Sequence, residues 1–305
     1  MVAYLFAGQG SQYIGMGKDL YQTFPESKAV FDKASAALGF DVKERCFSGP
    51  ENMLKVTNTS QPAIVTVTIA ALEAFKAAVG PKLQAPSFYA GLSLGEYSAL
   101  IAAGSLSFED GLRLVRRRAE IMNEAAQKYP GKMAAVIDLP LEQIKDICLK
   151  SGAEIANLNL PAQTVISGKP EAVDKAREKC IAAGAKRVIE LEVSGGFHSS
   201  LMLEASVELK QVLEGISLAA PAVPVVSNYT ARPQYRTGQI RENLVYQMYS
   251  PVKWEESVRF MIEQGVNKFI EFGPGKVLKG ILKKIDPALE VVSIEKKEDI
   301  LALMA

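Results

Sequence analysis

The stretch YAGLSLGEYSAL, residues 89–100, places Ser93 between Gly91 and Gly95, with an apolar run before it and a helix-forming run after it. This G-x-S-x-G pattern is typical of a nucleophile elbow, a sharp turn from strand to helix that exposes the serine Oγ. Flanking glycines relieve crowding at such a corner. The N–H of Leu94, at the start of the helix, is placed to donate to an oxyanion. The pattern also fits an ordinary structural turn, and both interpretations stay open here.

The segments around the serine alternate between strand and helix patterns. We expect strands at residues 2–6 and 87–90, and helices at residues 60–79, with Pro62 in the first turn, at residues 94–103, and from residue 108 onward. Ser107 and Asp110 form a capping-box pattern before that last helix. Further strands are expected at residues 223–228, 268–272 and 289–294. The alternation predicts an α/β fold with a largely parallel sheet.

The order of expected strands and helices changes between about residues 131 and 193, where a βαββαβ order is typical of a ferredoxin-like unit. The expected strands are residues 133–137, 154–157, 164–167 and 187–191, and the expected helices are residues 141–150 and 171–183. We therefore predict a core made of residues 1–126 and 196–305, with a small subdomain, residues 127–195, inserted into it.

Composition restricts the class of protein. The 305 residues are 48% hydrophobic and 23% charged, with a net charge of +1, which gives no electrostatic support for a nucleic-acid partner. We find no apolar run near the roughly 20 residues that span a bilayer and no signal-peptide pattern at the start, so we expect no membrane partner and a cytoplasmic location. Cys46, Cys148 and Cys180 are isolated, which predicts small buried residues and neither disulfides nor a metal site.

A nucleophilic serine needs a base, and the sequence contains one histidine, His198, in the glycine-bearing segment VSGGFHSS. A contact between Ser93 and His198 is therefore a sharp prediction. The alternative is an ordinary surface or core histidine. Spacing identifies no Asp or Glu as a third member. The segment FAGQGSQ, residues 6–12, follows the first strand and offers the Gln9 N–H as a second oxyanion donor, although a structural turn is an equal interpretation.

Three consecutive arginines, Arg116, Arg117 and Arg118, cannot share one helix face. Arg117 falls opposite the apolar face, where we expect a solvated charge, and Arg116 lies at a boundary. Arg118 lies at the margin of the buried stripe, where an unpaired guanidinium is costly. Either a carboxylate of the protein or a carboxylate of a substrate would satisfy it.

Taken together, seven motifs in this order closely resemble the malonyl-CoA:acyl carrier protein transacylase family, over essentially the full chain. They are GQGSQ (8–12), GLSLGEYSAL (91–100), LVRRRAEIMNEA (114–125), NLNLPAQTVISG (157–168), GGFHSS (195–200), YQMYSPVKWEESV (246–258) and EFGPGKVLKGIL (271–282). The resemblance implies an α/β-hydrolase-like core with an inserted ferredoxin-like domain.

The resemblance also implies a ping-pong reaction in which Ser93 takes malonyl from malonyl-CoA and passes it to the phosphopantetheine thiol of acyl carrier protein, for fatty acid synthesis. His198 would be the general base and then the general acid. The oxyanion hole would use the backbone N–H groups of Gln9 and Leu94, and a backbone carbonyl at Gln247 would orient the imidazole without an acidic residue. No cofactor is implied beyond the coenzyme A of the substrate, and we expect a monomer.

Arg118 matches the family arginine that binds the malonyl carboxylate, which favours the substrate as its partner. The chain departs from the commonest family pattern at Leu92, where many members have histidine, and at Ala7, often a proline. These departures put the selectivity between malonyl and substituted malonyl groups in doubt. Further candidate pocket residues are Leu92, Gln61, Asn159 and Phe197, of which Gln61 and Asn159 fit a turn and a strand end equally well.

Four competing functions remain. The nearest is a discrete acyltransferase of a polyketide assembly line, with the same chemistry and another carrier protein. An acyl-carrier-protein hydrolase gains nothing from a carboxylate-binding Arg118. An ordinary esterase would need an acid between nucleophile and histidine in chain order, and a binding protein would not need Ser93 and His198.

Overall fold

The larger sheet carries the elbow. The computed structural model describes residues 1–80 and 84–304, with only the backbone of Lys55. In these residues the strand order is β10-β9-β1-β2-β7-β8, and every neighbouring pair is parallel except β7 with β8. The strands are β1 (Val2–Phe6), β2 (Phe88–Gly91), β7 (Val225–Val226), β8 (Pro233–Gln234), β9 (Lys268–Phe272) and β10 (Glu290–Ile294). The carboxyl end of β2 therefore lies near the middle of a parallel sheet, where α/β proteins place their sites.

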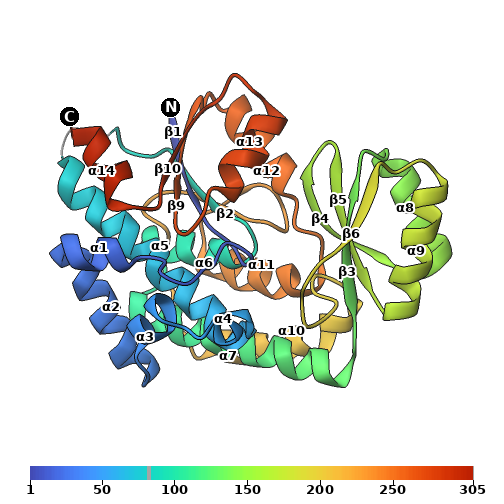
Figure 1. The fold of residues 1–305 in the computed structure, drawn as a ribbon, viewed down its shortest axis with the longest axis horizontal. Helices are drawn as coiled ribbons and strands as arrows, with labels where there is room; N and C mark the ends of the chain where they lie inside the picture. The colour runs from blue at the N-terminus through green and yellow to red at the C-terminus, as the bar shows by residue number, and fades with distance from the viewer. Residues whose placement is uncertain (81–83, 305) are drawn as a thin grey trace.

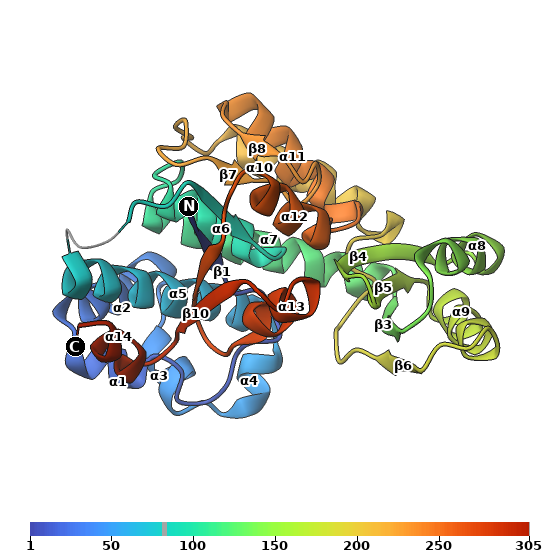
Figure 2. The same cartoon turned by 90° about the horizontal axis from the view of Figure 1, so that it is seen from above.

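Helices cover both faces of this sheet because its central strands are apolar on both sides. Figure 2 shows α2 and α5 on one side and α12 on the other. The helices of the core are α1 (Lys18–Thr23), α2 (Pro25–Leu38), α3 (Val42–Phe47), α4 (Glu51–Lys55), α5 (Thr57–Val79), α6 (Leu94–Ala102), α7 (Phe108–Lys128), α10 (Leu203–Glu214), α11 (Thr237–Tyr249), α12 (Trp254–Glu263), α13 (Val277–Ile285) and α14 (Lys297–Met304), with a short 3₁₀ turn at Ser200–Met202. The predicted α/β class with a parallel sheet is confirmed.

Helix α5 differs from the sequence expectation at its start. It begins at Thr57 instead of residue 60, because the carbonyl of Val56 accepts hydrogen bonds from the N–H groups of Thr59 (3.0 Å) and Ser60 (2.9 Å). Pro62 consequently lies inside the helix and not in its first turn. The expectation that no apolar stretch has membrane-spanning length was also wrong. Among the described residues α5 alone passes that test, but 72% of its most apolar window is buried within the fold, as in a core helix.

A second, four-stranded sheet stands apart from the first, on the right of Figure 1, and α7 leads into it. Its elements are β3 (Lys132–Ile137), α8 (Leu141–Ser151), β4 (Glu154–Leu160), β5 (Gln163–Gly168), α9 (Pro170–Ala182) and β6 (Arg187–Glu190). The order β4-β5-β3-β6, antiparallel throughout, is the ferredoxin-like arrangement that the βαββαβ pattern predicts.

This small unit is tied to the core by β4. A bridge joins Asn157 to Val252, with hydrogen bonds of 2.9 Å from the Leu158 N–H to the Val252 carbonyl and from the Val252 N–H to the Ala156 carbonyl. β4 runs to Leu160, three residues further than expected, so Asn159 lies within the strand. We propose that residues 127–195 form the inserted subdomain and that residues 1–126 and 196–305 form the core.

Candidate active site

Ser93 occupies the corner between β2 and α6, as the sequence predicts. It has φ 51° and ψ −98°, a left-handed conformation that non-glycine residues rarely adopt. A Cβ on Gly95 would overlap the carbonyl of Phe6, and a Cβ on Gly91 would overlap the backbone of Gly95. Both glycines are therefore required, because the elbow packs directly against the end of β1 and against its own backbone. The strained backbone at Ser93 is typical of a position that presents a functional side chain.

The predicted contact between serine and histidine is present. Ser93 Oγ lies 2.8 Å from His198 Nε2, and His198 Nδ1 lies 2.8 Å from the backbone carbonyl of Gln247 on α11. A carbonyl only accepts, so Nδ1 carries the hydrogen and Nε2 presents a lone pair to the serine hydroxyl. Within the described residues no carboxylate bonds to His198. The geometry thus contains a base oriented by a backbone carbonyl.

The electrostatic surroundings keep His198 neutral. Burial and, to a smaller extent, the neighbouring Arg118 guanidinium lower the pKa of its imidazole from 6.5 to about 4, while the bond to the Gln247 carbonyl acts in the opposite direction. His198 itself has φ 57°, so both members of the pair have unusual backbone conformations. A neutral imidazole is the form that accepts a proton from serine.

Arg118 lies deeper than the margin position that its helical phase indicates, with 1% of its surface exposed. Its Nη1 donates to Gln61 Oε1 at 2.9 Å, and its Nη2 lies 3.3 Å from both Ser93 Oγ and Gln247 Oε1. The guanidinium also lies 5.2 Å from the centre of the Tyr97 ring. Its partners are thus neutral, and its Nε–H has no hydrogen-bond acceptor in the described part of the chain. The guanidinium of Arg118 therefore presents N–H groups beside Ser93 that can donate hydrogen bonds to a carboxylate.

Gln61 corrects one sequence expectation. It is fully buried in α5, neither in a turn nor lining the cavity. Its Oε1 accepts the hydrogen bond from Arg118 Nη1. Its Nε2 donates to Gln9 Oε1 at 3.1 Å. Gln61 therefore links the GQGSQ loop to the arginine.

The pair opens into a cavity of about 810 Å³ between the core and the small sheet. Of the predicted residues, those that line it are Gln9, Leu92, Ser93, Arg118, Asn159, Phe197 and His198. Leu94 does not line it, but its N–H is at the first position of α6, where helical N–H groups lack intrahelical acceptors. Gly8 has no room for a side chain because a Cβ there would overlap the carbonyl of Leu92, so the GQGSQ loop lies directly against the elbow.

Sequence reasoning missed a buried polar network behind the elbow. Glu96, fully buried in α6, accepts hydrogen bonds from the Asn228 N–H (3.0 Å), Gln247 Nε2 (2.7 Å) and Gln234 Nε2 (2.7 Å). Burial raises the pKa of its carboxyl from 4.5 to about 7, although these three donors and Arg118 act in the opposite direction. The available signals were a lone carboxylate in the apolar helix LGEYSALIA and the polar pair Ser227 and Asn228 at the end of the strand expected at residues 223–228.

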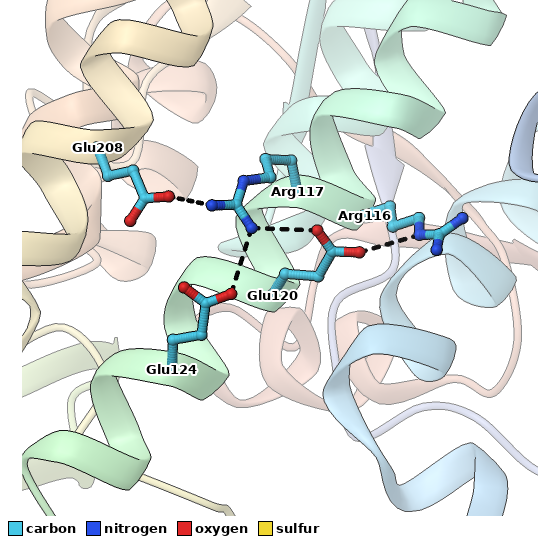
Figure 3. A network of polar contacts seen from close by, with 5 residues as sticks. All are labelled: Arg116, Arg117, Glu120, Glu124 and Glu208. Carbon is cyan, nitrogen blue, oxygen red and sulfur yellow. Dashed lines mark hydrogen bonds and ion pairs between the residues drawn. The ribbon is translucent and has the colours of Figure 1, made fainter.

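Arg117 points away from the site, as its helical phase predicts, and Arg116 also does not line the cavity. Figure 3 shows Arg117 contacting Glu120 and Glu124 on α7 and Glu208 on α10, while Arg116 pairs with Glu120. Arg117 is not simply solvated, because these ion pairs join two helices. No group of three or more metal-ligating side chains occurs in the residues that the structure covers. Cys46, Cys148 and Cys180 are buried and free, as predicted.

Comparison with known proteins places this geometry in a family. The model of the acyl transferase domain matches residues 3–297. The chain belongs to the acyl transferase family. It is 45% identical over 304 residues to a malonyl CoA-acyl carrier protein transacylase of Bacillus subtilis, covering 98% of this chain and 95% of the relative.

Solved structures agree with this membership. An acyl carrier protein S-malonyltransferase from Vibrio cholerae superposes with a TM-score of 0.94 at 38% identity, over 99% of each chain. A malonyl-transacylase in complex with its type II PKS acyl carrier protein superposes with a TM-score of 0.95 at 39% identity, over 99% of this chain and 98% of that one. As a member of the acyl transferase family, the chain is an enzyme that transfers acyl groups.

Proposed function

We propose that this acyl transferase moves malonyl from malonyl-CoA to acyl carrier protein through an ester on Ser93. The observation that carries the proposal is the convergence of three groups: Ser93 Oγ lies 2.8 Å from His198 Nε2 and 3.3 Å from the guanidinium of Arg118. A nucleophile, its base and a cation for a carboxylate thus meet at one cavity. The relatives named above carry the same activity in their names.

In the first half-reaction, Ser93 Oγ attacks the thioester carbonyl while its proton moves to His198 Nε2. The N–H groups of Gln9 and Leu94 stabilise the oxyanion of the tetrahedral intermediate. The C–S bond then breaks, and His198 returns the proton to the departing coenzyme A sulfur. The bond from Nδ1 to the Gln247 carbonyl stabilises the imidazolium that forms between these steps.

Arg118 supplies selectivity for the malonyl carboxylate. Its two 3.3 Å contacts are longer than the about 2.7–2.9 Å of charge-assisted hydrogen bonds, so a carboxylate replaces them favourably. A neutral acyl group leaves this buried cation without an anionic partner. Beside the nucleophile, Leu92 is a non-polar side chain of the cavity, and it provides no hydrogen bond to the acyl group.

The cavity also offers a place for coenzyme A. Lys276 and Lys284, on and beside α13, line it, and neither has an ion-pair partner among the described residues. We propose that these two ammonium groups bind the phosphates of malonyl-CoA, because both carry unpaired positive charge at the cavity.

In the second half-reaction, the thiol of carrier-bound phosphopantetheine attacks the Ser93 ester. His198 takes the thiol proton and returns it to Ser93 Oγ. We propose that the carrier belongs to fatty acid synthesis; the relatives at 38–45% identity are named for transfer of malonyl to an acyl carrier protein. A polyketide carrier remains the alternative, since one structural neighbour was solved with a type II PKS carrier protein.

We further propose a cytoplasmic monomer that needs no cofactor beyond coenzyme A in its substrate. One chain supplies the nucleophile Ser93, the base His198 and the cation Arg118, and proton transfer between Ser93 and His198 requires neither metal nor redox chemistry. Light scattering during size-exclusion chromatography tests the monomer, because a mass of twice 33.0 kDa would contradict it.

Intact-protein mass spectrometry after a brief exposure to malonyl-CoA tests the whole proposal. We expect a malonyl adduct on the wild type and none on Ser93→Ala, and we expect the adduct to move to acyl carrier protein. Carrier proteins from fatty acid and polyketide systems, compared at equal concentration, distinguish the two pathways. An adduct that water removes at the same rate with or without carrier would support a hydrolase instead.

A further inference from the structure

Asn228 contacts the elbow on both sides of its turn. It follows β7, has no exposed surface, and its side-chain amide reaches the strand-to-helix corner of β2 and α6. The Ser93 N–H donates to Asn228 Oδ1, and Asn228 Nδ2 donates to the carbonyl of Gly91 at 2.8 Å. One amide group thus holds the residue that presents the nucleophile and the residue two positions before it.

These two contacts admit only one orientation of the amide. The Gly91 carbonyl only accepts and the Ser93 N–H only donates, so the oxygen and nitrogen ends of the Asn228 side chain cannot exchange. An aspartate in the same place keeps an acceptor for Ser93 but turns a second oxygen toward the Gly91 carbonyl. The pairing therefore requires an amide and not merely a polar side chain.

The backbone of Asn228 is itself fixed from two directions. Its N–H donates to Glu96 Oε2 at 3.0 Å, and its carbonyl accepts from the Lys253 N–H at 2.9 Å. Glu96 also accepts from Gln247, whose carbonyl orients His198. The elbow and the base are thus attached to one buried network. Asn228 is the member that bonds to the elbow at both Gly91 and Ser93, and Gln247 Nε2 adds a contact of 3.2 Å to the Ser93 carbonyl.

The elbow needs such support because Ser93 is strained. A non-glycine residue at φ 51° and ψ −98° persists only where its surroundings fix it. Relaxation of this backbone would move Ser93 Oγ away from its position 2.8 Å from His198 Nε2 and would also turn the Leu94 N–H. Displacements of about 1 Å at a reacting group cost roughly 100-fold in rate.

We propose that Asn228 is a positioning residue for acylation, whose side-chain amide holds the strained elbow so that Ser93 meets His198 and the Leu94 N–H meets the oxyanion. This inference rests on the proposed role of Ser93 as the nucleophile. It separates two properties of the site: Asn228 governs the rate of attack on any acyl group, whereas Arg118 governs which acyl group is chosen.

The test measures the rate constant and the final extent of acyl-enzyme formation by rapid quench and intact mass, with malonyl-CoA and with acetyl-CoA. We compare the wild type, Asn228→Ala, Asn228→Asp and Ser227→Ala. Ser227 is the matched control, because it is equally buried and, among the residues that the structure describes, its Oγ bonds only to the Tyr229 N–H in the same loop. We expect wild-type behaviour from the control.

For Asn228→Ala we expect the rate constant to fall about 100-fold for both acyl groups, with an unchanged ratio between them and an unchanged half-saturating malonyl-CoA concentration. Asn228→Asp is expected to be slowed as well. A merely structural role would lower the final extent of labelling, as the folded fraction falls, and leave the rate constant of the folded molecules unchanged.

The inference is overturned if Asn228→Ala labels at the wild-type rate, or if the slowing is confined to malonyl. Failure of the proposed function looks different, because the wild type would then gain no adduct, or Ser93→Ala would gain the same one. Normalising the rate to the labelled fraction keeps the test valid for a partly unfolded variant.

Discussion

Replacing Arg118 with glutamine should remove the preference for malonyl while leaving the nucleophile and base in place. The guanidinium is 1% exposed, and its partners are oxygen atoms of Gln61, Gln247 and Ser93. A hydrogen bond to a charged group contributes about 1.5–3 kcal/mol, and each 1.4 kcal/mol is tenfold, so kcat/KM for malonyl-CoA should fall roughly 10- to 150-fold. Transfer of acetyl should be unchanged or faster, because the variant no longer leaves a buried cation without an anion.

The assay is the competition of malonyl-CoA and acetyl-CoA for the same enzyme, which reports the ratio of the two kcat/KM values directly. Arg117→Gln is the matched control. Arg117 is the adjacent residue of α7 and carries the same charge, but its side chain is 36% exposed and contacts Glu120, Glu124 and Glu208 away from the cavity (Figure 3).

Partly exposed ion pairs of the kind formed by Arg117 contribute about 0–1 kcal/mol, so Arg117→Gln should lower stability slightly and leave the acyl preference unchanged. If Arg118→Gln kept the wild-type ratio of malonyl to acetyl, the assignment of Arg118 as the carboxylate partner would be refuted. Equal losses for both substrates would likewise show that Arg118 acts on Ser93 and not on the malonyl carboxylate.

Three further predictions follow from the site. The pKa of His198 is lowered to about 4, so its neutral, proton-accepting form persists well below pH 6.5, and the acylation rate of the free enzyme should fall only as pH drops through about 4; a pH–rate profile with its acid limb at 6.5 would contradict this. Replacing Lys276 and Lys284 with alanine should raise KM for malonyl-CoA, most strongly at low salt, and leave malonyl-pantetheine unaffected, because that thioester lacks the nucleotide phosphates; equal effects on both thioesters would exclude a phosphate contact. Gly95→Ala should lower the thermal unfolding temperature and abolish acylation, since its Cβ would overlap the rigid carbonyl of Phe6; a folded, active variant would show that the elbow can move away from β1.

The order of elements and the identity of the reacting pair could be read from local patterns. The run from strand to serine to helix, the capping box at Ser107 and the βαββαβ rhythm each depend on residues close in sequence, and the structure reproduces them within a few residues. The Ser107 hydroxyl accepts from the Asp110 N–H at 3.1 Å, as the pattern predicts. His198 was identifiable because the sequence offers no other histidine.

The depth of Arg118 and the place of Gln61 were not predictable in this way. Helical phase put Arg118 at the margin of the apolar stripe, but packing of α7 against α5 encloses it and brings Gln61 to its Nη1. Amphipathic periodicity predicts which face of a helix packs against one neighbouring layer. It contains no information about a second helix that covers the margin.

The sequence by itself determined which residues can do chemistry: a serine at a glycine-flanked turn, one histidine, and an arginine near an apolar face. Only the tertiary structure decided how those residues are held. Asn228 reaches Gly91 and Ser93 across more than 130 positions of the chain, and Glu96 collects donors from segments 132 to 151 positions away. Such contacts arise because parallel strands bring their carboxyl ends to one edge of the sheet, where residues distant in sequence satisfy one another's buried polar groups.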